Sequence, residues 1–202
     1  ADDDETLCRT AFGHAVPFDE LLDKGFARLP LPDAPFANGG FPTPSGRCEF
    51  FSERLAATGL DGLPDHLPNH EVPGSDARFP LAMISPPARN FLNSTFVNVQ
   101  SLRDIEGEPM LEISAADAAA RGIVSGDVVR VFNARGSHLC KASVSPRARA
   151  GVVNGLGIWW RKLGLDGTNV NELTSQRLTD LGRGPVFYDC LVQVVPHGTA
   201  DA

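Results

Sequence analysis

The stretch DAAARGIVSGDVVRV, residues 117–131, decides the fold because a helix signature passes directly into a strand signature there. Ser114 stands just before it as a helix N-cap, and Asp117 takes the capping-box position that Glu usually holds. The alanines favour helix, and Gly122 is typical of a helix end. The alternating apolar residues of 127–132 indicate a strand. We therefore predict a short helix over residues 115–121 with a strand after it.

The strand pattern continues on both sides of this stretch. Residues 133–136, NARG, form a turn signal, and residues 137–144 pair back as the second strand of a hairpin. Further apolar runs predict strands over 79–84, 110–113, 151–153 and 190–195. Short strands broken by turn residues, with one helix among them, indicate a mainly β fold, specifically a small and mostly antiparallel barrel.

The first 76 residues differ in composition from the rest of the chain. They hold nine of the 16 prolines and few alternating runs, so they predict an extended arm with short helices over 18–26 and 50–57. A segment of this length without a core must lie on something, and its phenylalanines would pack on the barrel or on parts of a parent protein. We predict two domains, an arm of residues 1–76 and a barrel of residues 77–202.

Charge divides in the same way. Residues 1–76 hold 14 acids and 5 bases, whereas residues 77–202 hold 11 acids and 13 bases, and the whole chain carries −7. No concentrated basic face is present, which argues against nucleic-acid binding. The mildly basic second segment suits a small anionic ligand, although solvated surface charge accounts for it equally well. No apolar run is long enough to cross a bilayer.

The cysteines and histidines do not form a metal site. Cys8, Cys48, Cys140 and Cys190 are far apart, so their spacing excludes a zinc ribbon or an iron–sulfur motif, and a reducing cytoplasm is the expected location. The chain opens on an acidic run without an initiator Met, which indicates a start inside a longer protein. No residue is predicted to be catalytic or to ligate a metal.

Three motifs in order carry a resemblance to a known family. Residues 117–131 fit a "DA…GI..GD.V.V" pattern followed by the N.RG turn, and residues 43–52, TPSGRCEFFS, precede it. NELT at 171–174 and GPVFY at 184–188 follow it. Together they resemble the C-terminal molybdopterin-dinucleotide-binding domain of the dimethyl-sulfoxide-reductase superfamily, with formate-dehydrogenase-like and related anaerobic dehydrogenases as the nearest members.

The resemblance implies a six-stranded double-psi β-barrel that binds bis-molybdopterin guanine dinucleotide. It also implies an electron-transferring oxidoreductase whose remaining chain is the partner of this part. The molybdenum or tungsten, its ligand and a possible iron–sulfur cluster would belong to that remaining part, so the 202 residues alone are expected to be inactive. The alternative is a stand-alone double-psi barrel that acts as a protein-binding or adaptor module, because fold does not determine function.

The resemblance also places two regions against the cofactor. Amides, hydroxyls and backbone N–H groups suit pterin, guanine and pyrophosphate. The predicted contacts are Ser85, Pro86, Asn90, Asn93 and Ser94 in the loop after the first strand, and Asn171, Gly184, Pro185, Phe187 and Tyr188 near the end. The alternatives are a solvated polar loop around Asn93, a helix N-cap at Asn171 and core packing of Phe187.

Overall fold

The computed structural model of the chain describes residues 3–198. Contacts divide the chain into two compact units, Ala1–His66 and Leu67–Ala202. Residues 67–76, which composition groups with the arm, therefore belong by their contacts to the second unit.

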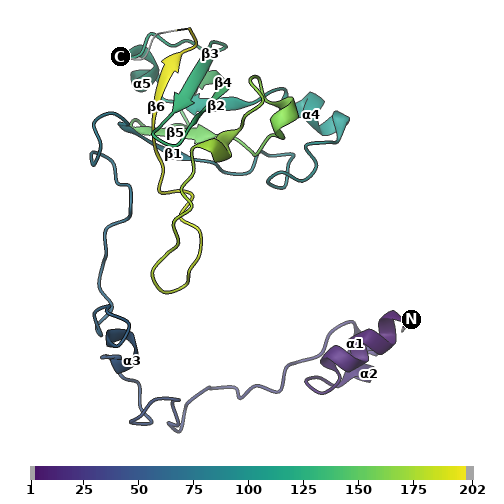
Figure 1. The fold of residues 1–202 in the computed structure, drawn as a ribbon. Helices are drawn as coiled ribbons and strands as arrows, with labels where there is room; N and C mark the ends of the chain where they lie inside the picture. The colour runs from purple at the N-terminus through teal and green to yellow at the C-terminus, as the bar shows by residue number, and fades with distance from the viewer. Residues whose placement is uncertain (1–2, 199–202) are drawn as a thin grey trace. The chain divides into compact units, whose positions relative to one another are not determined.

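The first unit holds three short helices, α1 (Asp4–Phe12), α2 (Phe18–Lys24) and α3 (Glu53–Ala56), joined by irregular chain (Figure 1). Helix α2 ends where Gly25 adopts a φ of 73°, and α3 begins after the N-cap Ser52. Both were expected, with longer bounds. Helix α1 was not expected, because its acidic run was interpreted only as a start inside a longer protein; Asp3 caps it by accepting a hydrogen bond from the Thr6 amide at 2.8 Å.

The second unit is a closed barrel. Its strands are β1 (Leu81–Ile84), β2 (Met110–Ile113), β3 (Val128–Phe132), β4 (Ser137–Val144), β5 (Val152–Gly155) and β6 (Leu191–Pro196). They follow one another around the barrel in the order β1-β5-β2-β4-β3-β6 (Figure 1). The β1–β5 and β2–β4 pairs are parallel and the other four pairs are antiparallel. The predicted mainly β fold, a six-stranded double-psi barrel with short helices, is confirmed.

Alternation along the strands fills the barrel. In the β3–β4 hairpin, Val129 pairs with Cys140 and Val131 pairs with His138, and all four side chains are buried. Leu111 of β2 is fully buried among them. The aliphatic side chains that share this interior hold the strands together by removing apolar surface from water.

The stretch that decides the fold behaves as predicted. Helix α5 spans Ala115–Ala119, and the Ser114 hydroxyl accepts a hydrogen bond from the Asp117 amide at 3.1 Å. The Ser114 hydroxyl also donates to the Asp117 carboxylate at 2.6 Å, so the predicted N-cap forms, but Asp117 contacts the Ser114 side chain and not its backbone amide as in a capping box. Gly122 has a φ of 64°, a left-handed conformation that turns the chain out of the helix and towards β3.

A second, smaller core lies beside the barrel. Phe91 and Trp159 pack edge to face with ring centroids 5.1 Å apart, and Ala88 and Val97 are buried with them. Helix α4 (Gln100–Glu106), which was not predicted, flanks this core. This core joins the loop after β1, which supplies Ala88, Phe91 and Val97, to the loop after β5, which supplies Trp159.

Two 3-10 turns and a long loop complete the unit. The turns are η1 (Arg161–Leu163) and η2 (Val170–Glu172). The loop of residues 174–190 leaves η2, extends away from the strands as a narrow hairpin and returns to β6 (Figure 1). We call it the wall loop. Within residues 3–198, no helix is long and apolar enough to cross a membrane.

Candidate functional site

A cavity of about 500 Å³ lies between three loops of the barrel unit. One loop follows β1, one follows β5, and the third is η2 with the wall loop. The lining residues are Ser85, Pro87, Asn93, Ile158, Asn171, Thr174, Ser175, Pro185, Phe187 and Tyr188. Six of the ten predicted cofactor contacts are therefore brought together, namely Ser85, Asn93, Asn171, Pro185, Phe187 and Tyr188.

Strand pairing explains why two of these loops meet. Strands β1 and β5 run parallel, with Ile84 opposite Asn154, so their carboxyl ends lie at one edge of the barrel. Ser85 follows β1 directly, and Ile158 comes shortly after β5. The loops that follow these two strands therefore meet at this edge, where both line the cavity.

The loop after β1 presents Asn93 at a tight turn. Leu92 and Thr95 exchange two backbone hydrogen bonds of 3.1 and 2.9 Å, and Asn93 between them has a φ of 53°. Asn tolerates this left-handed conformation better than most residues. The Ser94 carbonyl accepts a hydrogen bond from the Trp160 indole at 2.8 Å, which holds the turn in place. Ser94 thus positions the loop through its backbone and does not line the cavity.

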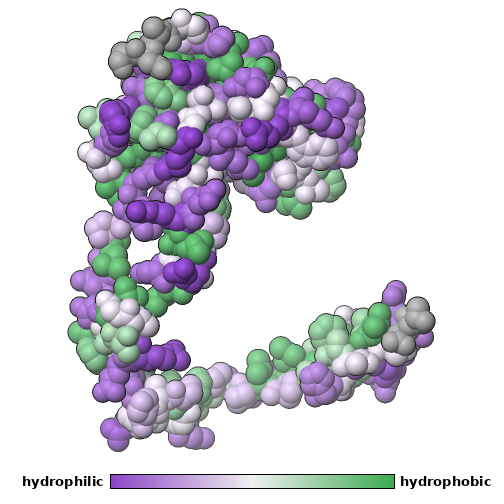
Figure 2. Space-filling view, viewed as in Figure 1, coloured by the Kyte–Doolittle hydropathy of each residue, from purple (hydrophilic) through white to green (hydrophobic). Residues whose placement is uncertain are grey.

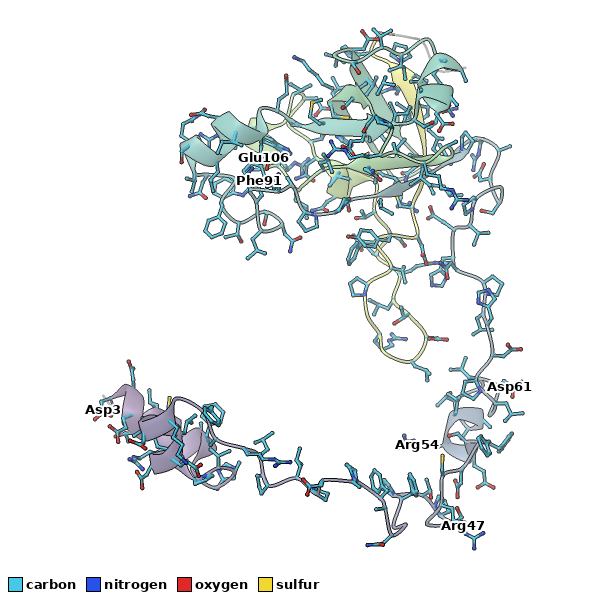
Figure 3. All side chains as sticks on the ribbon, turned by 180° about the vertical axis from the view of Figure 1, so that it is seen from behind. Asp3, Arg47, Arg54, Asp61, Phe91 and Glu106 are labelled. Carbon is cyan, nitrogen blue, oxygen red and sulfur yellow. The ribbon has the colours of Figure 1, made fainter. Side chains whose placement is uncertain are left out.

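Asn90 and Pro86 also serve the scaffold and do not line the cavity. The Asn90 backbone amide and side-chain amide both donate to one carboxylate oxygen of Glu106, at 2.6 and 2.8 Å. These bonds tie the loop to α4, which ends at Glu106 (Figure 3). The Pro86 carbonyl accepts from the Gly157 amide at 2.9 Å, which joins the loops after β1 and β5.

Asn171 is exposed on the cavity side of η2. The alternative that Asn171 is a helix N-cap is wrong. Asn169 holds that position, and its side chain accepts a hydrogen bond from the Asn171 amide at 3.0 Å. Asn171 is therefore a residue of the turn itself, and it lines the cavity.

The wall loop supplies the aromatic part of the lining. The rings of Phe187 and Tyr188 pack edge to face with centroids 4.6 Å apart, and the residues are 41% and 47% exposed. The alternative of core packing for Phe187 is therefore wrong. Gly184 lies outside the cavity lining: its amide donates to the Thr179 hydroxyl at 2.9 Å in the narrow part of the hairpin.

Four lining residues were not predicted: Pro87, Ile158, Thr174 and Ser175. Pro87 follows the predicted Pro86, Thr174 is the last residue of the NELT motif, and Ser175 is one position beyond that motif, so all three lie within or next to predicted segments. Ile158 required knowing that β1 and β5 are parallel neighbours. No local pattern carries that information, since the two strands are far apart in sequence.

The cavity is lined by neutral groups. Amides and hydroxyls provide hydrogen bonds, and Ile158, Phe187 and Tyr188 provide apolar or flat surface; no lining residue is charged. Such a surface can bind a planar ligand with polar edges. It offers no thiol and no imidazole for covalent or general-base chemistry. Within residues 3–198, no three His, Cys, Asp or Glu side chains are grouped to hold a metal.

The buried titratable groups lie in the barrel core. Burial lowers the pKa of His138, whose Nε2 atom has no hydrogen-bond partner among residues 3–198. Burial, together with the charge of Asp166, raises the pKa of the Cys140 thiol to about 12. A thiol of this kind is unreactive at neutral pH because the thiolate is not populated. Both side chains are therefore part of the packing.

Comparison with known proteins identifies the class. Residues 81–191 match the molybdopterin dinucleotide binding domain family, which is more than half of the chain. The chain therefore belongs to this family, a domain of the dimethyl sulfoxide reductase superfamily.

Individual relatives agree with this assignment. The chain is 35% identical over 200 residues to the probable oxidoreductase YoaE of Bacillus subtilis (strain 168), which covers 96% of this chain and 28% of that protein. It is 34% identical over 168 residues to dimethyl sulfoxide reductase DmsA of Escherichia coli (strain K12), which covers 75% and 20%. The likeness to formate dehydrogenases stays a prediction.

A solved structure shares the fold. Acetylene hydratase from Pelobacter acetylenicus superposes with a TM-score of 0.70 and 19% identity, over 88% of this chain and 27% of that one. The chain spans only part of its curated relatives, between 14% and 28% of their length.

Proposed function

We propose that this chain binds a bis-molybdopterin guanine dinucleotide within a larger molybdenum or tungsten oxidoreductase. In this proposal, the cavity of about 500 Å³ receives a planar end of the cofactor, either pterin or guanine. The supporting observation is that three loops, separated in sequence, bring Asn93, Asn171 and Tyr188 to one cavity. All three are residues that the family resemblance predicts to contact the cofactor.

The residues present fit such a group. Pterin and guanine have polar edges that need paired donors and acceptors, and Asn93 and Asn171 each offer both. Their ring faces need flat or apolar neighbours, which Phe187 and Ile158 provide. The lining has no Lys or Arg, so the pyrophosphate would depend on backbone N–H groups and hydroxyls such as those of Thr174.

The division of labour follows from this chemistry. The bound cofactor supplies oxygen-atom or electron transfer at its metal, whereas the residues of this chain bind and orient it. The metal ligand, and any iron–sulfur cluster, would come from the rest of the oxidoreductase, the partner of this chain. The 202 residues alone should then be inactive. The adaptor alternative explains the barrel but not the convergence of amides and aromatic rings at one cavity.

The test uses Asn93→Ala and Asn171→Ala in the complete oxidoreductase. Each change leaves a buried polar edge of the cofactor without its partner, which costs about 1–3 kcal/mol. We expect bound molybdopterin after gel filtration to fall about tenfold or more under dilute conditions, with the melting temperature nearly unchanged.

Asn98→Ala is the matched control, because Asn98 is an exposed asparagine that does not line the cavity. It should keep its cofactor. Full cofactor occupancy in both cavity variants would remove these residues from the site. A melting temperature lowered as much as the occupancy would instead assign them a structural role.

A further inference from the structure

The wall loop carries half of the cavity lining, yet it projects from the barrel (Figure 1). Its own bonds are those of a narrow hairpin, including Thr179 N–H to the Gly184 carbonyl at 2.8 Å. These bonds shape the hairpin but do not connect it to the strands. The position of Pro185, Phe187 and Tyr188 over the cavity must therefore be set at the base of the loop.

The base consists of Leu173 and Leu191, which flank the wall loop. Both accept hydrogen bonds from the turn between β3 and β4, residues 133–136. The Asn133 amide donates to the Leu173 carbonyl at 2.9 Å and to the Leu191 carbonyl at 3.1 Å, so one side chain joins the two residues that flank the loop. The Arg135 Nε also donates to the Leu173 carbonyl, at 2.7 Å. The Cys190 thiol is a third donor to that carbonyl, at 3.3 Å.

The Cys190 thiol is protonated when it donates to the Leu173 carbonyl. Burial raises the pKa of Cys190 to about 11, although the neighbouring Arg135 opposes this rise. At neutral pH the group is therefore a neutral donor rather than a thiolate.

The segment Asn69–Glu71 also bonds to the wall loop and to Leu191, which follows it. The Glu71 carboxylate forms an ion pair with Arg135 and accepts a hydrogen bond from the Leu191 amide at 2.7 Å. Asn69 donates to the Asp189 carboxylate at 3.0 Å, and the His70 Nδ1 lies 3.0 Å from the Arg177 guanidinium. Three consecutive residues thus each bind a residue of the wall loop or its end.

Gly136 shows how closely the turn approaches. A Cβ at this position would lie 3.0 Å from the Glu172 carbonyl oxygen and 3.3 Å from the Glu172 Cβ. Glycine therefore lets the turn approach the end of η2, from which Asn171 faces the cavity. Every defined residue of the N.RG motif contacts this segment. Asn133 and Arg135 donate to the Leu173 carbonyl, and Gly136 lies against Glu172.

Glu71 and Arg135 stabilise each other's charged forms. Burial alone would raise the pKa of Glu71, but hydrogen bonds from Arg135 and the Leu191 amide, with the charges of Arg135 and Arg177, bring it below its usual value. The hydrogen bond to Glu71 raises the pKa of Arg135. Both groups are therefore ionised at neutral pH.

We propose that Glu71, Asn133 and Arg135 form an anchor cluster of positioning residues, which fixes the wall loop over the cavity and so sets how tightly the cofactor is held. This inference rests on the proposed function. Cofactor contacts need their supporting side chains to be held within a fraction of an ångström, so a loosened base would weaken binding without any change in the cavity residues.

The experiment compares Arg135→Met with Arg121→Met. Arg121 is the matched control because it also pairs with a carboxylate and donates to a backbone carbonyl, both of Asp117, but it bonds no residue of the wall loop. Hydrogen exchange of residues 174–190 is measured in the 202-residue chain, and cofactor retention is measured in the complete oxidoreductase. We expect Arg135→Met to speed exchange of the loop about tenfold and to shorten cofactor retention severalfold.

Arg121→Met should change neither the hydrogen exchange of residues 174–190 nor cofactor retention, even if it lowers stability. Arg135→Lys should restore part of both, because lysine keeps the charge opposite Glu71 but lacks the fork that also reaches Leu173. Unchanged exchange in Arg135→Met overturns the anchor cluster. Faster exchange with normal retention also overturns it, and the proposed function survives that result if Asn171→Ala loses the cofactor. Normal retention in every variant overturns both.

Discussion

The part of the arm in the first unit, residues 3–66, and the barrel unit hold the same kinds of apolar residues, but bury them to opposite degrees. Among residues 3–66, Phe18 is the one buried hydrophobic side chain, and Phe50 is 85% exposed. Figure 2 shows hydrophobic residues on the surface along this segment. In the barrel, Leu111, Val129 and Val131 are fully buried. Hydrophobic content alone therefore does not predict a core; the residues must alternate along strands that can close on one another.

The helices follow the same rule. Helices α1, α2 and α3 have nine, seven and four residues, and isolated helices shorter than about 12–15 residues are marginal in water. Helix α5 has only five residues, yet its Asp117 accepts a hydrogen bond from the Gly151 amide at 2.8 Å and its Ala118 is buried in the barrel core. Tertiary packing, rather than helix length, stabilises α5.

Hydrogen exchange should show the largest difference between the two regions. We expect amides of residues 3–66 to exchange at close to unprotected rates in the isolated chain, because local opening there exposes almost no further apolar surface. Amides of β2, β3 and β4 should be protected by a factor of about a thousand or more. Uniform protection from Phe12 through Ser52 would show that the arm is an integral layer of a stable fold.

A matched leucine substitution should sharpen the comparison. Leu111→Ala removes a fully buried side chain from the barrel, whereas Leu31→Ala changes one that is 68% exposed in the arm. We expect the first to lower the free energy of unfolding by about 2–5 kcal/mol and the second by less than about 0.5 kcal/mol. Urea unfolding followed by tryptophan fluorescence measures this, since Trp159 and Trp160 both lie in the barrel unit. Equal losses would mean that the arm has a core of its own.

The sequence predicted the barrel well because local signals specified it. The strand over 137–144 has the expected bounds, and Ser114 caps α5 as expected. Helices α1 and α4 were missed for different reasons. The first begins in an acidic run that was interpreted only as a start inside a longer protein, and the second has no side-chain cap hydrogen bond and no acidic residue in its first turn.

The candidate site was predictable only in part. Asn93 and Asn171 came from the family resemblance, but nothing local distinguished them from Asn90, which bonds Glu106 of α4. That choice depends on α4, which the sequence did not reveal. The anchor cluster was also beyond the sequence, because Glu71 and Arg135 are 64 positions apart. The N.RG motif was recognised as a turn, whereas its contacts to Leu173 required the closed barrel.

The smallest expected effect concerns acid stability at the base of the wall loop. The pKa of Glu71 is lowered from its usual 4.5, so its ionised form stabilises the folded chain above about that pH. This contribution is lost as the pH falls through the lower folded pKa. We therefore expect wild type to exceed Glu71→Gln by less than about 1 kcal/mol at pH 6–7, since the pair with Arg135 is partly exposed. The difference should shrink below about pH 4.5, where the facing charges of Arg135 and Arg177 lose their partner.

Urea unfolding of wild type and Glu71→Gln at several pH values and constant ionic strength measures this difference. Asp76→Asn is the control, because its pair with Arg78 is more exposed and should contribute less. A wild-type advantage that grows as the pH falls would contradict the ionised pair and remove its charge from the anchor cluster.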